Sequence, residues 1–126
     1  LLFVWAGASG TADYFAGFIG NKLSVPLGQM FFRAVLCNFF VCLAVLCGIK
    51  LKSESGKFLM ITICISGFVV SGFEHCIANM FYFGLVSTPT KYAVPLLIMI
   101  LGNSTGGILL CKLTQHVQIQ KNSENA

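Results

Sequence analysis

Charged side chains are scarce in this sequence. They make up 10% of its 126 residues, against roughly a quarter in an ordinary soluble domain, whereas 56% of the residues are hydrophobic. The mean hydropathy is +0.85. This composition excludes a typical soluble globular domain and indicates a membrane protein. The net charge of +4 comes from short loops and tails, where it reports topology, so we expect no nucleic-acid partner.

Catalytic and metal-binding patterns are also missing. The chain has no H-E-x-x-H motif and no phosphate-binding loop, and no two cysteines have the C-x-x-C spacing. We therefore expect no enzymatic activity, no cofactor and no metal site. The cysteines all fall in apolar segments and are interpreted as free thiols that pack as small hydrophobic side chains: Cys37, Cys42, Cys47, Cys64, Cys76 and Cys111.

Three apolar segments, 30–49, 58–83 and 92–113, are long enough to cross a bilayer as helices. A fourth, from residue 1 to about 18, opens on LLFVWAG without an initiator methionine, a basic region or a cleavage site, so it is not a signal peptide. We interpret the chain as a fragment that begins within a spanning helix. The prediction is an all-α polytopic membrane protein, with a transmembrane region at 1–115 and a polar tail at 116–126 that frays into disorder.

The positive residues predict the topology. The positive-inside rule counts Lys and Arg in short loops and favours a cytoplasmic location for the loop at 50–57 and for the C-terminal tail, which carry Lys50, Lys52, Lys57, Lys112 and Lys121. The opposite side carries fewer cations: Lys22, Arg33 and Lys91.

The segment 58–83 is longer than one span requires and contains the pairs Ser66-Gly67 and Ser71-Gly72. Two interpretations are open. The helix breaks at a substrate site, as helices of transporters do, or the small residues let neighbouring helices approach closely.

Polar residues interrupt the same segment at GFEHCIANMF, residues 72–81. Ionisable groups inside a spanning helix are costly and usually face the protein interior or a water-filled path, which makes Glu74 and His75 functional candidates. In a continuous helix, His75 and Asn79 would share a face with Ser71, whereas Glu74 would point elsewhere. The alternative for His75 is a structural histidine that is hydrogen-bonded to a neighbouring helix.

The stretch GFEHCIANMF resembles the G-F-E-H-S-I-A-N-M hallmark of the formate/nitrite transporter family, with Cys76 in place of the usual serine. Two further stretches resemble family segments in the same order. They are FFRAVLCNFFVCLAVLCG at 31–48, similar to the fourth helix, and LGNSTGG at 101–107, similar to the sixth.

The resemblance implies an aquaporin-like channel fold of six helices, built as two inverted halves, with a broken fifth helix and five protomers to a ring. This chain resembles the C-terminal half, from the end of the third helix to the sixth. The implied partners are small monovalent anions, protons, the lipid bilayer and further copies in a homo-pentamer. The implied location is the plasma or inner membrane, with a cytoplasmic C-terminus.

The resemblance also implies residue roles. His75 matches the central pore histidine and Phe68 an apolar constriction, Asn38 and Val41 match pore-lining residues, and Lys22 matches a lysine at the outer mouth. The pore is supported by Glu74, Asn79, Ser71 and Asn103. Many family members have a proline in the first half of the fifth helix. The stretch ITICISGF at 61–68 has none, so Ser66-Gly67 is the expected site of the break.

The leading hypothesis is therefore transport of small monovalent anions, such as formate, nitrite, lactate or hydrosulfide, through a pore with a central histidine. The alternative is a truncated membrane protein that does not transport and assembles with full-length paralogues. The sequence encoded upstream of Leu1 distinguishes the two hypotheses.

Overall fold

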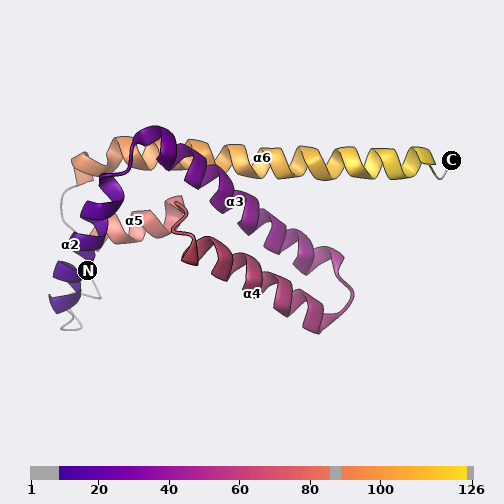
Figure 1. Cartoon of the computed structure of the whole chain (residues 1–126), viewed down its shortest axis with the longest axis horizontal. Coiled ribbons are helices and arrows are strands. Elements are labelled where there is room, and N and C mark those ends of the chain that lie inside the picture. The colour runs from indigo at the N-terminus through magenta and orange to yellow at the C-terminus, as the bar shows by residue number, and fades with distance from the viewer. Residues whose placement is uncertain (1–8, 86–88, 125–126) are drawn as a thin grey trace.

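The computed structural model describes residues 9–85 and 89–124, and in these ranges it contains only helices and their connections. The elements are α2 (Ser9–Leu23), α3 (Leu27–Lys50), α4 (Glu54–Val70), α5 (Cys76–Leu85), the 3-10 helix η1 (Pro89–Tyr92) and α6 (Ala93–Glu124). Much of the apolar segment predicted at the start of the chain lies outside the described residues. Helix α3 packs against both α4 and α6, and α2 and α5 lie together near the start of α6 (Figure 1).

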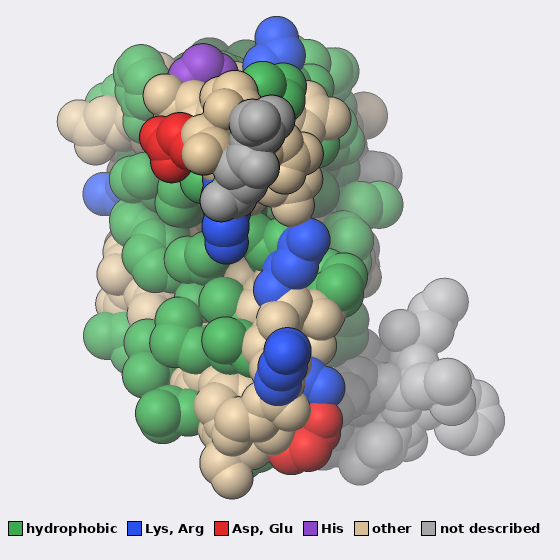
Figure 2. All heavy atoms as spheres, turned by 90° about the vertical axis from the view of Figure 1, so that its right-hand side faces the viewer, with side chains coloured by type: hydrophobic (Ala, Val, Ile, Leu, Met, Phe, Trp, Pro, Cys, Tyr) green, Lys and Arg blue, Asp and Glu red, His purple; other side chains and the backbone are tan. Residues whose placement is uncertain are grey.

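Helices α3 and α6 are long and apolar enough to cross a membrane, with 24 and 32 residues. They contain the predicted span 30–49 and all of the predicted span 92–113 except Tyr92, which ends η1. Large hydrophobic side chains remain on the outside of the molecule, among them Phe58, which is 75% exposed, and Val70, which is 86% exposed. Figure 2 shows such side chains over much of one face, with Lys and Arg side chains at several separate places from its top to its bottom. This exposed apolar surface agrees with a lipid environment.

The predicted segment 58–83 forms two helices, because α4 ends at Val70 and α5 begins at Cys76. The backbone N–H of Phe73 donates to the carbonyl of Phe68, and the N–H of Gly72 donates to that of Val69, both at 3.1 Å. Gly72 has a φ of 66°. These features form a Schellman motif, in which a glycine in the left-handed region ends the helix and satisfies its last carbonyls. Segment 71–75 then connects α4 to α5 without helical structure.

The expectation that this segment breaks at Ser66-Gly67 is wrong, because both residues lie inside α4. Gly67 faces α3, where a Cβ atom would lie 3.8 Å from the ring of Phe40. Glycine can occupy the interior of a helix, as Gly67 does. Gly72 instead has the positive φ that terminates a helix.

The C-terminal tail also differs from the prediction of disorder, since α6 continues to Glu124. No proline or glycine occurs between Ile108 and Glu124, so nothing in the sequence forces the helix to stop. The hydroxyl of Thr114 donates to the carbonyl of Leu110 at 3.0 Å, so this polar side chain is hydrogen-bonded within its own helix.

Helices α3 and α6 cross in very close contact at three glycines of α6. A Cβ atom at Gly102 would lie 2.6 Å from Cβ of Ala34, one at Gly106 would overlap the carbonyl of Val35, and one at Gly107 would lie 2.9 Å from the amide nitrogen of Asn38. Only glycine fits in such an approach, the usual role of a G-x-x-x-G pair in membrane helices. The same five residues match the letters G-x-S-x-G, but a nucleophile site needs a strand-to-helix turn and these lie inside α6.

A small apolar core lies near this crossing. Phe83 and Tyr92 stack with their ring centroids 4.6 Å apart, and they belong to one buried cluster with residues of α2, α3 and α6. The other buried members are Ile19, Met30, Ala34 and Met99. The core therefore fixes α2, α5 and α6 around the start of α3, and the connection between α4 and α5 lies beside it.

Candidate functional site

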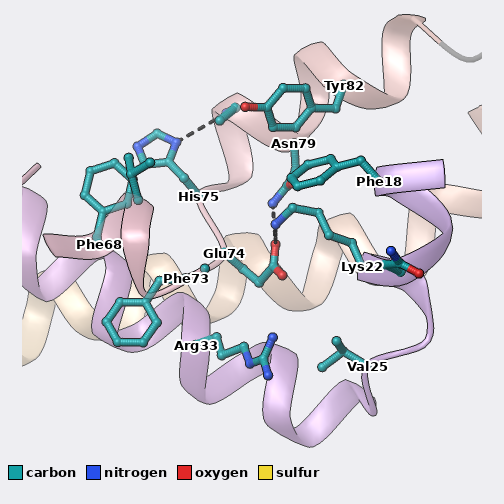
Figure 3. Close-up of a pocket in the computed structure, with 14 residues that line it drawn as sticks. Phe18, Lys22, Val25, Arg33, Phe68, Phe73, Glu74, His75, Asn79 and Tyr82 are labelled. Atoms are coloured by element: carbon teal, nitrogen blue, oxygen red, sulfur yellow. Dashed lines mark hydrogen bonds and ion pairs between the residues drawn. The ribbon is translucent and has the colours of Figure 1, made fainter. Parts of the chain in front are cut away.

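A cavity of about 480 Å³ lies between α2, α3 and the connection from α4 to α5 (Figure 3). It forms there because segment 71–75 leaves the helical path and exposes its side chains to the space beside α2 and α3. Its walls combine aromatic and polar side chains: Phe18, Asn21, Lys22, Val25, Arg33, Phe68, Val69, Gly72, Phe73, Glu74, His75, Ala78, Asn79 and Tyr82.

Glu74 is fully buried and is the centre of the polar contacts in this cavity. Its Oε2 atom accepts from Nζ of Lys22 at 2.7 Å and from the side-chain amide of Asn79 at 2.8 Å. Its Oε1 atom has no hydrogen-bond partner among the described residues. A buried carboxylate needs a compensating charge, and Lys22 on α2 supplies it.

Asn103, on α6, connects the site to the helix crossing. Its Nδ2 group donates to the carbonyls of Ala34 at 2.8 Å and Glu74 at 2.9 Å, and its Oδ1 atom accepts from the backbone N–H of Cys76 at 2.9 Å. The amide of Asn38 donates to the backbone carbonyl of Asn103 at 2.6 Å. One buried side chain thus satisfies backbone groups on α3 and on both sides of the start of α5, where helical bonding is incomplete.

His75 precedes the first residue of α5, and its ring stacks on that of Phe68 with the centroids 5.8 Å apart. Its Nδ1 atom accepts from the backbone N–H of Ala78 at 3.3 Å. A neutral imidazole has one donor and one acceptor nitrogen. Because Nδ1 accepts, the proton of the neutral ring is assigned to Nε2, which is left as the donor of the ring.

The structure brings five of the predicted site residues together around the cavity: Lys22, Phe68, Glu74, His75 and Asn79. Asn38 and Asn103 lie behind them and join the cavity wall to α3 and α6 through the bonds above. Val41 is half-buried on α3 and does not line this cavity.

Ser71 lies apart from this group. The expectation of one helical face for Ser71, His75 and Asn79 is wrong, because residues 71–75 are not helical. Ser71 caps the end of α4 and is exposed, Asn79 is buried beside Glu74, and His75 stacks on Phe68.

Sequence reasoning missed Arg33 as a residue of the site. It counted Arg33 only toward the charge of one membrane side, although this arginine is the one charged side chain between Leu27 and Ile49 of α3. That isolation was the available signal, because a charge within an apolar helix normally faces a protein interior or a polar path.

A helical bundle with apolar outer surfaces, and with a mixed polar and aromatic cavity at a helix interruption, is a pattern found at the substrate sites of membrane transporters. The family model described as "Formate/nitrite transporter" matches residues 1–117. The chain therefore belongs to the formate/nitrite transporter family. This membership, together with the two helices that are long and apolar enough to cross a bilayer, indicates an integral membrane protein.

Relatives with names from this family share about two fifths of the aligned residues. The "Formate-nitrite transporter 2" of Toxoplasma gondii is 42% identical over 71% of this chain and 21% of its own length. The "Nitrite transporter NirC" of Salmonella typhimurium is 35% identical over 73% of this chain and 37% of its own length. A "Probable formate transporter" of Methanothermobacter thermautotrophicus is 38% identical over 81% of this chain and 39% of its own length. The chain thus spans less than half the length of the relatives it matches.

Proposed function

We propose that this chain takes part in the transmembrane transport of small monovalent anions of weak acids, such as formate, nitrite, lactate or hydrosulfide, along a path beside His75. The observation that carries the proposal is the cavity in which His75, Phe68 and the Lys22–Glu74 pair meet at a helix interruption. Family membership supports it, since one relative is named a nitrite transporter and another a probable formate transporter.

The chemistry of the passage follows from the cost of moving a bare anion into hydrocarbon. A neutral weak acid crosses far more readily, and desolvation raises the pKa of the acid and so favours its neutral form. The Nε2–H group of His75 is the donor we assign to the arriving anion, either as a hydrogen bond or as a proton. Phe68, stacked on the imidazole, would narrow the path and exclude hydrated ions.

We further propose that the connection between α4 and α5 is the break of the fifth family helix. On this interpretation the chain supplies one of two inverted halves of a protomer, and protomers assemble in a ring of five. The C-terminus and the loop at 50–57 face the cytoplasm. Protons are then the second partner, because each anion that is neutralised must take up a proton and later release it.

The proposal is tested with the protein made from its complete gene and reconstituted in lipid vesicles. Uptake of formate, nitrite, lactate and hydrosulfide is measured after a gradient is imposed, with protein-free vesicles as the control. We expect saturable uptake of at least one of these anions that is faster when the outside is more acidic. Uptake of formate, nitrite, lactate and hydrosulfide no faster than in protein-free vesicles would refute the proposal.

A further inference from the structure

One cation of the cavity, Arg33, has no partner among the side chains that the structure describes. Its guanidinium forms no hydrogen bond and no ion pair with those side chains, at 15–84 and 90–124, although Arg33 is partly buried and lines the cavity. Lys22, the other cation of the cavity, is 2.7 Å from Glu74 and has a side chain that is only 14% exposed. Figure 3 shows the side chains of Arg33, Lys22 and Glu74 directed into the same space from three different elements.

The difference between a paired Lys22 and an unpaired Arg33 decides the net charge of the described part of the cavity. Lys22 and Glu74 neutralise each other, so an anion that enters the cavity is attracted mainly by the remaining charge on Arg33. Arg33 lies six residues inside α3, about 9 Å from its first residue along the helix axis. A charge at that depth is costly unless it faces a polar path or a ligand. The absence of a partner within the described part of the chain therefore points to an anion as the partner of Arg33.

Arginine and lysine differ in the geometry of the anions that they bind best. Its planar guanidinium offers parallel N–H groups that match the two oxygens of a carboxylate, whereas an ammonium acts as a point charge. Formate and nitrite are both planar and carry two oxygens on one atom. A guanidinium can hold both oxygens of such an anion at once.

We propose that Arg33 is the anion-binding residue of the cavity and holds a planar oxyanion of the formate or nitrite type by two N–H···O bonds before the anion reaches His75. In this arrangement Lys22 keeps the buried carboxylate of Glu74 neutralised, so that Glu74 does not repel the anion. This inference rests on the proposed transport function and adds a residue and a binding geometry to it.

The test compares Arg33→Gln and Arg33→Lys in the protein made from its complete gene. Lys91→Gln is the matched control, since it removes one positive charge from an exposed residue of η1 that does not line the cavity. The KM and maximal rate of formate and nitrite uptake are measured in vesicles, and gel filtration reports whether each variant is folded. We expect Arg33→Gln to raise KM about tenfold or more, the size of a lost charge-assisted pair, with Lys91→Gln unchanged.

Arg33→Lys separates shape from charge. We expect it to fold like the parent protein and still to raise KM several-fold, because the ammonium keeps the attraction and loses the second N–H···O bond. A KM equal to that of the parent in Arg33→Lys overturns the two-bond geometry, and a KM in Arg33→Gln equal to that of Lys91→Gln overturns the binding role. A parent protein that takes up none of the proposed anions instead refutes the transport function itself.

Discussion

The ammonium of Lys22 and the carboxylate of Glu74 form an ion pair of 2.7 Å across 52 residues of sequence. The pair joins α2 to the connection between α4 and α5, and the Glu74 side chain is only 1% exposed. The resemblance to the transporter family implied that Lys22 matches a lysine at an outer mouth. In the structure the charge of Lys22 is engaged by Glu74, so its first effect is to hold α2 against the start of α5.

Removal of one charge of this pair should lower the free energy of unfolding much more than removal of both charges. We expect Lys22→Met to lower the free energy of unfolding by about 3–5 kcal/mol, because it leaves the buried carboxylate of Glu74 unpaired. The double variant Lys22→Met with Glu74→Gln should recover much of this loss, since the uncharged amide needs no cation. Thermal unfolding in detergent of both single variants and the double variant gives the coupling. Additive losses would show that the pair does not hold these elements together.

The close crossing of α3 and α6 gives a second prediction. Gly106→Ala should lower stability by roughly 1–3 kcal/mol, because its new methyl group would overlap the carbonyl of Val35 and force the helices apart. Gly84→Ala is the matched control: it makes the same change inside α5, where an added Cβ meets no atom within 4 Å.

The two variants are compared by their melting temperatures in detergent. Gly84→Ala should be neutral or slightly stabilising, since alanine is the better helix former. Equal melting temperatures for the two variants would mean that the crossing tolerates side chains and that the glycines are not required there.

The parts of this fold that the sequence predicts are those that depend on local pattern. The apolar runs of α3 and α6 define spanning helices by length alone. The helix end is harder to predict, because Ser66-Gly67 and Ser71-Gly72 have the same letters and only the second glycine has a positive φ. Local sequence does not decide between them: Gly67 lies inside α4 beside Phe40 of α3, whereas Gly72 ends the helix.

In the site, too, some residues are predicted by a local motif and others depend on how the helices pack. The family motif predicts Glu74 and His75 as a pair with different roles, and the cavity contains both. The partner of Glu74 is 52 residues away and comes from another helix, so no periodicity reveals it. Arg33 was visible as an isolated charge, but its approach to the same cavity depends on how α3 crosses α6. Tertiary packing thus decides which of the two cations is paired within the described residues.

The last prediction separates the two neighbouring ionisable residues. His75→Phe, in the protein made from its complete gene, should fold normally and lose the proton-dependent part of formate uptake, because the ring volume is roughly kept while the donor is removed. Glu74→Leu should fail mainly in yield and assembly, because removal of one partner of a buried charged hydrogen bond leaves Lys22 without its acceptor and Asn79 with only the sulfur of Met99, at a cost of about 1–3 kcal/mol or more. Gel filtration measures assembly, and uptake at several external pH values measures function. If His75→Phe instead aggregates while Glu74→Leu assembles and changes only uptake, the roles assigned to the two residues are reversed.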